Sequence, residues 1–500
     1  MSYNKLLPDR QISVFKVYNE LEKYAISNTS DRETQKSYFL SLVSKNKELT
    51  EDEKNYCQEM FIRNFELYNV VHKYGKPVEC NNCKSMRYSA RYCESCIKQH
   101  LQSLFGTWTS GNAIVDEFIQ ECQVISSIPP HIMEWIPFEQ FDDVKYLTKG
   151  GFSTVYSATW KRASIYDWDE TDKKFIYFGQ FGPQRVVLKS LNDPGKDFFN
   201  EAINYSKIQS NSIVFCHGIT KFPENGNYMM VMNNHPDGNL RDYLKNNNST
   251  LSIKDKISIF RYLCVSLYDI HKKKLVHCDL HSGNILMESS NCFITDLGLC
   301  GPVDEKSSNE VYGIIPYVAP ETLCGKKNTK ESDIYSVGML MWEIFSGCPP
   351  FDNRPHNTDL IIEIFDGLRP AIPQNIPKSF AEMMQRCWDI APSKRPTIEE
   401  LCKFANDEFE KAYKVGKFEE NISISLNQKQ ICDPHPLAYH SSRILSDIIP
   451  KSINLLSKDN DNKSSYDNSG YKTLQYDLEL PERFSEININ DDAIAEEERS

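Results

Sequence analysis

Residues 275–287 read LVHCDLHSGNILM, and this stretch decides the fold of the chain. Asp279 and Asn284 stand between apolar runs that are typical of short buried strands. Farther along, the run CFIT, residues 292–295, predicts another strand, and it delivers Asp296 in the tetrapeptide TDLG. These two polar motifs and their spacing carry the assignment that follows.

The pattern resembles the catalytic loop H-R-D-L-x-x-x-N and the D-F-G motif of eukaryotic-type protein kinases. Cys278 replaces the arginine and Leu297 replaces the phenylalanine. The resemblance implies transfer of the ATP γ-phosphate to a protein hydroxyl, with ATP and Mg²⁺ as cofactors and a protein as the substrate. It implies that Asp279 accepts the hydroxyl proton and that Asn284 and Asp296 bind Mg²⁺. The implied catalytic residues are Asp279, Lys189, Asn284 and Asp296.

The run VKYLTKGGFSTVYSATW, residues 144–160, resembles the kinase glycine-rich loop, whose backbone N–H groups approach the phosphates. Aligned on Val155, the glycine positions of the family fall at Thr148, Gly150 and Ser153, and one glycine remains. On its own, this stretch would indicate a plain hairpin more often than a phosphate loop.

The run RVVLK, residues 185–189, predicts a buried strand that ends in Lys189. A buried lysine is costly without an anionic partner, and Glu201 follows in the helical pattern KDFFNEAINYSKI. The two residues resemble the kinase ion pair that holds the lysine on the α- and β-phosphates. A surface ion pair between a strand and a helix is the alternative interpretation.

The segment YMMVMNNHPDGNLRDYL fits the strand, hinge and helix of a kinase, with Met232 at the gatekeeper position. The resemblance implies that adenine bonds to the backbone of Asn233 and His235, while Val155 and Leu286 enclose the ring. The implied nucleotide-binding residues are Thr148, Gly150, Ser153, Val155, Lys189, Glu201, Asn233, His235, Asn284, Leu286 and Asp296.

Downstream segments agree with the kinase pattern. The resemblance implies that Asp333 holds the backbone of the catalytic loop. It also implies that Arg395 pairs with Glu321 of the A-P-E motif at residues 319–321. The tripeptides RCW and RPT near the end of the domain resemble those of the tyrosine-kinase-like group.

Specificity and regulation are expected to depart from the usual pattern. The run GIIPYVAPE resembles the segment that ends in A-P-E in serine/threonine kinases, with Ile314 in place of a threonine. It favours Ser/Thr specificity. His281 stands where serine/threonine kinases carry a lysine that touches the γ-phosphate. Because Cys278 cannot make bidentate contacts with a phosphate, we expect activity without a phosphate docked there. A pseudokinase scaffold that binds partners without phosphotransfer is the alternative function.

Two CxxC motifs lie in CNNCKSMRYSARYCESC, residues 80–96. Each can place two thiolates on one tetrahedral Zn²⁺, so Cys80, Cys83, Cys93 and Cys96 predict a structural zinc site similar to short ribbon-type fingers. The loop between the motifs is shorter than the commonest zinc-ribbon spacing. A redox pair or a coincidence is the alternative interpretation.

The composition limits the remaining functions. A formal net charge of −12 argues against nucleic-acid binding. No apolar run is long enough for a membrane span, and the N-terminal residues lack the apolar core of a secretory signal. Most cysteines stand singly in apolar segments, as at Cys264, Cys292, Cys348 and Cys387. This usage suits a reducing compartment, so we expect a cytoplasmic or nuclear protein.

We therefore expect an α+β chain with a bilobal protein kinase fold, a β-rich small lobe and a helical large lobe. The expected segments are a helical region 1–79, a zinc-binding module 80–100, a linker with a short helix 101–137, the kinase domain 138–404 and a largely disordered acidic tail 405–500. The aromatic-rich insertion 161–184 predicts either a hairpin that packs its own aromatic rings or a docking site for signalling partners. The N-terminal region is a second candidate for recruiting such partners.

Overall fold

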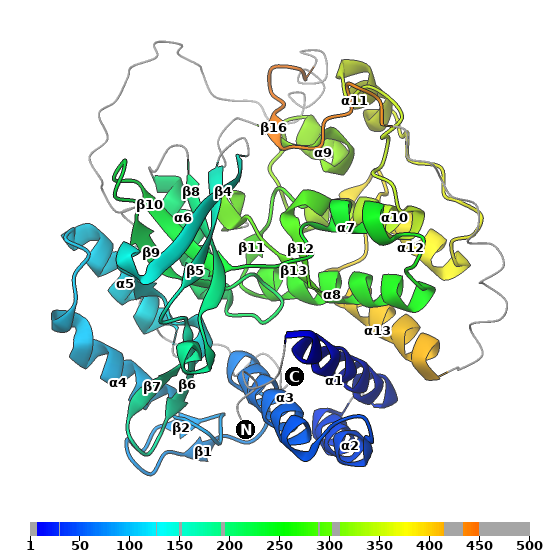
Figure 1. The fold of residues 1–500 in the computed structure, drawn as a ribbon. Coiled ribbons are helices and arrows are strands. Elements are labelled where there is room, and N and C mark those ends of the chain that lie inside the picture. Colours follow the sequence, from blue (N-terminus) through cyan, green and yellow to red (C-terminus); the bar gives the residue numbers. More distant parts are fainter. Residues whose placement is uncertain are drawn as a thin grey trace.

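The computed structural model describes residues 8–29, 31–126, 128–149, 153–191, 196–288, 291–302, 311–414 and 434–449. Its central part has a β-rich lobe joined to a helical lobe, with further helices of the N-terminal region below both (Figure 1). This arrangement fits the expected bilobal fold. No helix within the described ranges is both long and apolar enough to cross a bilayer.

The small lobe is built on a six-stranded sheet with the order β3-β9-β10-β8-β5-β4. Its strands are β3 (Glu134–Trp135), β4 (Phe141–Lys149), β5 (Ser153–Trp160), β8 (Gln184–Leu191), β9 (Cys216–Lys221) and β10 (Tyr228–Asn233). Alternation along the strands divides the apolar residues between two faces. Val186 and Leu188 of β8 pack in one cluster, while Met230 and Met232 of β10 pack on the other face with Phe198 of helix α6 (Lys196–Ile208).

The large lobe is mainly helical. Its helices are α7 (Leu240–Asn247), α8 (Ile253–Lys272), α9 (Pro320–Leu323), α10 (Lys330–Ser346), α11 (Thr358–Phe365), α12 (Lys378–Cys387) and α13 (Ile398–Lys414). Helix α10 is buried along almost its whole length and ends at Gly347, which has a φ of 81°. A Cβ at Gly347 would lie 2.0 Å from the side-chain nitrogen of Asn248. The left-handed turn and this close approach together require glycine at the helix end.

Short paired strands line the junction of the lobes and the adjacent surface. They are β11 (Leu275–Val276), β12 (Ile285–Glu288), β13 (Asn291–Ile294), β14 (Gly301–Pro302), β15 (Tyr312–Gly313) and β16 (Arg443–Ile444). β11 pairs with β14, β12 with β13, and β15 with β16. The β12–β13 hairpin holds the ends of the two motifs that decide the fold.

The N-terminal region contains the helices α1 (Pro8–Asn28), α2 (Arg32–Lys45) and α3 (Glu51–His72). Their apolar faces form a separate core in which the rings of Phe39 and Phe61 stack at 4.0 Å. Thr50 and Glu53 form a capping box at the start of α3, which satisfies two orphan backbone donors. Helix α1 lies beside α13 of the large lobe (Figure 1).

The region 101–137, expected as a linker with a short helix, is packed into the small lobe. It contains helix α5 (Ala113–Ile125), and the preceding helix α4 (Glu94–Leu104) overlaps its start. Val115, Phe118, Ile119 and Cys122 follow helical spacing and join the core that α6 also enters. β3 then pairs in parallel with β9 at the edge of the sheet. The segment is therefore part of the small lobe, because its apolar face needs a buried partner.

The insertion 161–184 forms a hairpin of strands β6 (Ile165–Asp169) and β7 (Lys174–Tyr177). Trp168 and Phe175 face each other at 5.0 Å between ring centroids. The ring of His100 on α4 lies 4.9 Å from Trp168, and Arg91 forms an ion pair with Asp167. The hairpin thus packs its own rings and also docks on Arg91, which lies between the two cysteine motifs, and on α4.

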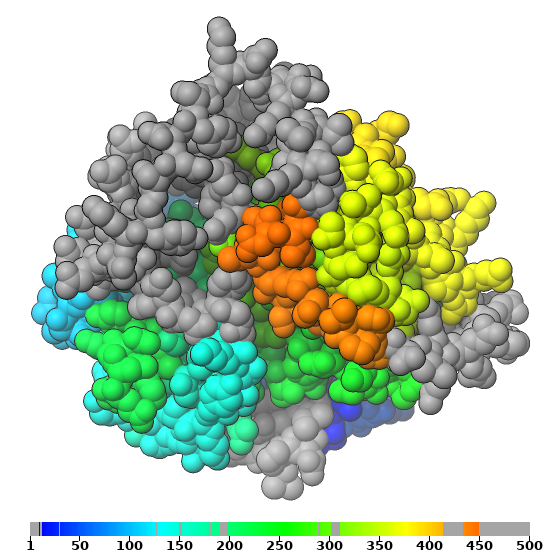
Figure 2. All heavy atoms as spheres, turned by 90° about the horizontal axis from the view of Figure 1, so that it is seen from above, coloured from blue at the N-terminus to red at the C-terminus, as the bar shows by residue number. Residues whose placement is uncertain are grey.

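The expected tail from residue 405 is ordered over two stretches. Helix α13 continues to Lys414, and residues 434–449 pack against the large lobe through β16 and two buried apolar side chains, Leu445 and Ile449. Figure 2 shows this C-terminal segment in orange beside the yellow-green residues of the large lobe. The other tail residues lie outside the described ranges.

Candidate active site

Lys189 on β8 forms a three-membered charge cluster with two carboxylates. Its ammonium donates to Glu201 Oε1 on α6 at 2.7 Å and to Asp296 Oδ1 at 3.0 Å. The side chains of Lys189 and Glu201 are 9% and 1% exposed, whereas that of Asp296 is 45% exposed. Burial lowers the pKa of Lys189, but Asp296 and Glu201 outweigh it, so the pKa lies above its ordinary value. The cluster therefore holds a permanent cation beside Asp296, its most exposed member.

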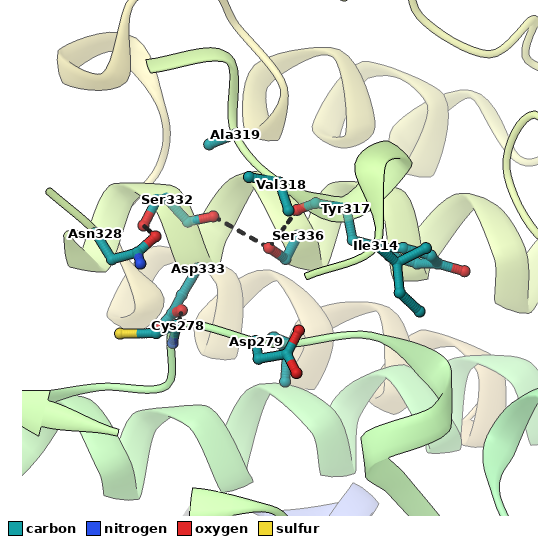
Figure 3. A pocket seen from close by; sticks show the side chains of 11 residues that line it. Cys278, Asp279, Ile314, Tyr317, Val318, Ala319, Asn328, Ser332, Asp333 and Ser336 are labelled. Atoms are coloured by element: carbon teal, nitrogen blue, oxygen red, sulfur yellow. Dashed lines mark hydrogen bonds between the residues drawn. The ribbon is translucent and has the colours of Figure 1, made fainter. Parts of the chain in front are cut away.

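The loop that carries Asp279 is fixed from below by Asp333 on α10. One oxygen of Asp333 accepts the backbone N–H of His277 at 2.8 Å and the other accepts that of Cys278 at 3.1 Å. Asn284 donates from its side-chain nitrogen to the backbone oxygen of Asp279 at 2.9 Å. Figure 3 shows Asp279, Cys278 and Asp333 around a pocket that Ile314 also lines. The structure thus brings the catalytic-loop residues together as the sequence pattern predicts.

Asp296 occupies a left-handed backbone conformation with a φ of 63°. Its N–H donates to the hydroxyl of Tyr205 on α6 at 3.0 Å. The neighbouring Asn204 donates to the backbone oxygens of Leu297 and Cys300 at 3.1 and 2.9 Å. These two α6 side chains hold the Asp296 motif against the helix that carries Glu201. Sequence reasoning missed both roles, although an asparagine on the apolar face of α6 was a usable signal.

The expected adenine pocket is partly described. Val155 on β5 lies opposite Lys189 of β8, and Thr148 of β4 lies opposite Val155. Ser153 begins β5, whereas Gly150 lies outside the described residues. Leu286 of β12 forms an isolated bridge with Asn239.

At the expected hinge, Met232 is buried in the sheet and Asn233 ends β10. The N–H of Asn233 donates to the backbone oxygen of Phe215 at 3.1 Å. The ring of His235 lies 4.4 Å from that of Phe293 on β13.

Asp279 has a partner that the sequence did not predict. Ser442 of the C-terminal segment donates its hydroxyl to the carboxylate, with distances of 2.8 and 2.7 Å to the two oxygens. Burial raises the pKa of Asp279, but the nearby His281 and the Ser442 hydroxyl outweigh it and keep the pKa below its ordinary value. Asp279 is therefore an ionised acceptor pointed at a serine hydroxyl.

The activation segment is the stretch from Asp296 to the A-P-E motif at residues 319–321. Its end is anchored in the large lobe. Arg395 donates to both oxygens of Glu321 at 2.6 and 2.8 Å. The Arg395 side chain is fully buried. This bidentate pair places A-P-E as the resemblance implies.

The four cysteines of residues 80–96 come together. Their Sγ atoms lie within 4.8 Å of one another, with 3.8 Å from Cys80 to Cys96 and 3.4 Å from Cys83 to Cys93. Tetrahedral bonds of about 2.3 Å to one Zn²⁺ would place sulfur atoms about 3.8 Å apart. The cluster thus has the donor set and dimensions of a zinc site.

Cys348, in contrast to the expectation of lone cysteines, is disulfide-bonded.

The two-lobed fold, the Lys189 cluster and the anchored Asp279 loop define a protein kinase domain. The family model for protein tyrosine and serine/threonine kinases matches residues 141–404. The chain belongs to this family.

Curated relatives carry kinase names. "Probable serine/threonine-protein kinase gdt4" of Dictyostelium discoideum is 28% identical over 56% of this chain and 16% of its own length. "Dual specificity protein kinase zakA" of the same organism is 31% identical over 40% of this chain and 28% of its own length. "Serine/threonine-protein kinase STY46" of Arabidopsis thaliana is 25% identical over 45% of this chain and 40% of its own length. The chain thus spans between 16% and 40% of these relatives.

Proposed function

We propose that this chain is an active, Mg²⁺- and ATP-dependent protein kinase that phosphorylates serine or threonine in intracellular signalling. The observation that carries the proposal is the joint placement of Lys189, Glu201 and Asp296 beside an anchored Asp279. A domain that merely binds partners has no physical need to keep a buried cation, two carboxylates and an ionised base in one place. The pseudokinase scaffold remains the competing function.

Each residue has a distinct role in this proposal. Mg²⁺-ATP supplies the phosphoryl group and the metal that neutralises the phosphate charge. Lys189, held by Glu201, binds the α- and β-phosphates, and Asn284 and Asp296 offer oxygen ligands of the kind that Mg²⁺ prefers. Asp279 orients the acceptor hydroxyl and takes its proton. The backbone of Asn233 and His235 would receive adenine, with Val155 and Leu286 on its two faces.

The proposed preference for serine and threonine is supported by the site itself. Asp279 already accepts a hydrogen bond from a serine hydroxyl in this structure. The names of two relatives specify serine/threonine kinases, and a third names dual specificity. We place the chain in the tyrosine-kinase-like group because of the RCW and RPT wording near Arg395.

We also propose that Cys80, Cys83, Cys93 and Cys96 bind one structural Zn²⁺. The spacing of their sulfur atoms supports this assignment. Hydrogen bonds from Ser85 lower the pKa of Cys83 to about 6, which favours the thiolate that a metal requires, whereas burial raises the pKa of Cys93 and Cys96. The module lies under the β6–β7 hairpin, so the metal would stabilise the edge on which the insertion docks. We propose a cytoplasmic or nuclear setting, which the free thiols of the other described cysteines support.

The proposal is tested by comparing the wild type with Asp296→Asn and with the control Asp366→Asn, an exposed aspartate of the large lobe. Transfer of labelled phosphate from ATP to a generic protein substrate is measured with Mg²⁺ and with EDTA. We expect wild type and Asp366→Asn to transfer phosphate with Mg²⁺ alone, and Asp296→Asn to lose at least about 100-fold because a metal ligand is gone. Equal signals from all variants would identify a scaffold with a contaminating kinase. Phosphoamino-acid analysis of the product tests the serine/threonine preference.

A further inference from the structure

The C-terminal segment 434–449 lies on the large lobe beside the active site and contains the two-residue strand β16 between turns. Its strand β16 pairs antiparallel with β15, with Ile444 opposite Tyr312 and Arg443 opposite Gly313. The N–H of Leu445 continues this pairing by donating to the backbone oxygen of Val311 at 2.7 Å. An added strand gains affinity from its main-chain hydrogen bonds and specificity from side-chain pockets. The activation segment therefore serves as the edge on which this peptide binds.

Apolar side chains fix the register of the bound segment. Leu445 is 0% and Ile449 7% exposed, and both enter a cluster with Val318, Leu360 and Ile364. The cluster contains side chains of the activation segment and of α11, so the C-terminal segment 434–449 lies between these two elements. A slip by one residue would turn Leu445 out of this cluster. Burial of Leu445 and Ile449 thus fixes the position of the residues that precede them.

Residues on both sides of Ser442 add polar contacts to the same region. His440 pairs with Asp352 at 3.0 Å, and Arg443 donates to the backbone oxygen of His356 at 2.9 Å. The guanidinium of Arg443 also lies 3.8 Å from the centre of the Tyr439 ring. Both sides of Ser442 are therefore held on the large lobe.

This register places the Ser442 hydroxyl on the catalytic carboxylate. The hydroxyl lies 2.7 Å from Asp279 Oδ2, and His281 Nε2 lies 2.8 Å from the same hydroxyl oxygen. His281 Nδ1 accepts the N–H of Gly283 at 3.0 Å, so in the neutral ring the proton is on Nε2. His281 then donates to Ser442, and Ser442 donates to Asp279. One lone pair of the serine oxygen remains for bond formation.

We propose that Ser442 is an autophosphorylation site that the chain modifies in cis, with residues 434–449 as a built-in peptide substrate. The proposal rests on the proposed kinase function. The Ser442 oxygen forms a bond to the γ-phosphorus of ATP while the bond from that phosphorus to the β-phosphate oxygen breaks. The serine proton moves to Asp279, and ADP leaves with the electron pair of the broken bond. His281 is a positioning residue that aims the acceptor oxygen.

The product does not fit the site as the serine does. A phosphoserine carries close to two negative charges at neutral pH, and Ser442 lies next to an ionised Asp279. Once Asp279 has passed this proton to solvent, repulsion between its carboxylate and the phosphate favours release of the segment. The bound segment would therefore be phosphorylated once, and its release would make Asp279 accessible to other protein substrates.

The test incubates the full chain with Mg²⁺-ATP and follows phosphate at Ser442 by mass spectrometry. The protein concentration is varied 100-fold, because a reaction in cis has a first-order rate that does not depend on concentration. The control Ser441→Ala changes the exposed neighbour, and it should leave the Ser442 rate unchanged. Leu445→Asp removes the apolar anchor. It should lower the Ser442 rate at least 10-fold and raise phosphorylation of a subsaturating external serine peptide.

The external peptide separates the two proposals. Peptide phosphorylation without phosphate at Ser442 would overturn the assignment of Ser442 and leave the kinase function standing. A Ser442 rate that rises in proportion to protein concentration would overturn modification in cis. Absence of phosphate on both peptide and chain would overturn the kinase function on which the inference rests. If Leu445→Asp phosphorylates the peptide and keeps the wild-type Ser442 rate, the docking geometry is wrong.

Discussion

Arg395→Ala should lower the free energy of unfolding by about 3–5 kcal/mol, because it leaves a buried carboxylate without its partner. Arg395 donates to both Glu321 oxygens and to the backbone oxygens of Glu331 and Asp389 at 2.9 and 3.0 Å. The arginine side chain is 0% exposed and that of Glu321 is 10% exposed. Water therefore cannot replace these contacts without opening the end of the activation segment.

A matched control is available in the same lobe. Arg386 pairs with Glu400 at 3.5 Å, and the two side chains are 49% and 54% exposed. Exposed pairs of this kind contribute at most about 1 kcal/mol, so Arg386→Ala should change stability little. The comparison separates the effect of burial from the loss of one positive charge.

Urea denaturation followed by tryptophan fluorescence measures both variants. With a slope of about 3 kcal/mol per molar urea, Arg395→Ala should lower the midpoint by about 1–2 M and Arg386→Ala by less than about 0.3 M. Equal shifts for the two variants would refute the reasoning from burial. A shift below about 0.3 M for Arg395→Ala would show that Glu321 finds another partner.

Three further perturbations have outcomes that follow from the structure. Tyr205→Phe removes the acceptor of the Asp296 N–H and should lower kcat/KM for ATP about 2- to 10-fold in a steady-state assay, as expected for one neutral hydrogen bond; an unchanged value would deny Tyr205 a positioning role. Burial raises the pKa of Asp269 to about 6, so the stability that its neutral form gives is present below about pH 4 and is lost as the pH rises through about 6. Asp269→Asn should therefore stabilise the chain more at pH 8 than at pH 5, by more than about 1 kcal/mol in paired urea titrations, and the opposite order would contradict the pKa direction. Cys83→Ser, or a strong chelator, should remove one equivalent of zinc by elemental analysis and lower the Tm; a chain that holds no zinc before treatment would contradict the metal assignment.

The sequence predicted which residues come together at the candidate site, because these residues lie on short loops whose spacing is fixed by the adjoining strands. Asp279 and Asn284 are five positions apart and are joined by a hydrogen bond. The buried pair of Lys189 and Glu201 was left open as a surface ion pair, because burial of a strand lysine depends on the sheet that covers it. In the structure the Lys189 side chain is 9% exposed, so the ion pair is buried.

Contacts between distant segments were not predictable in the same way. Ser442 and Asp279 are 163 residues apart in the chain, and their approach depends on the pairing of β15 with β16, which no local pattern encodes. A signal was present nonetheless, since the run RILSDII, residues 443–449, contains four large apolar residues within a polar tail. The region 101–137 was similarly taken for a linker with a short helix, although the spacing of Val115, Phe118 and Ile119 indicated that this helix is buried.

The central claim is that Asp279 is the base of an active phosphotransferase, and Asp279→Asn tests it most directly. The variant keeps the size and the oxygen acceptor of the side chain but cannot take the hydroxyl proton at neutral pH. Single-turnover phosphorylation of a serine peptide by Mg²⁺-ATP should fall about 100- to 10,000-fold relative to wild type, while the affinity for ATP stays unchanged. A variant that transfers phosphate at the wild-type rate would contradict the account.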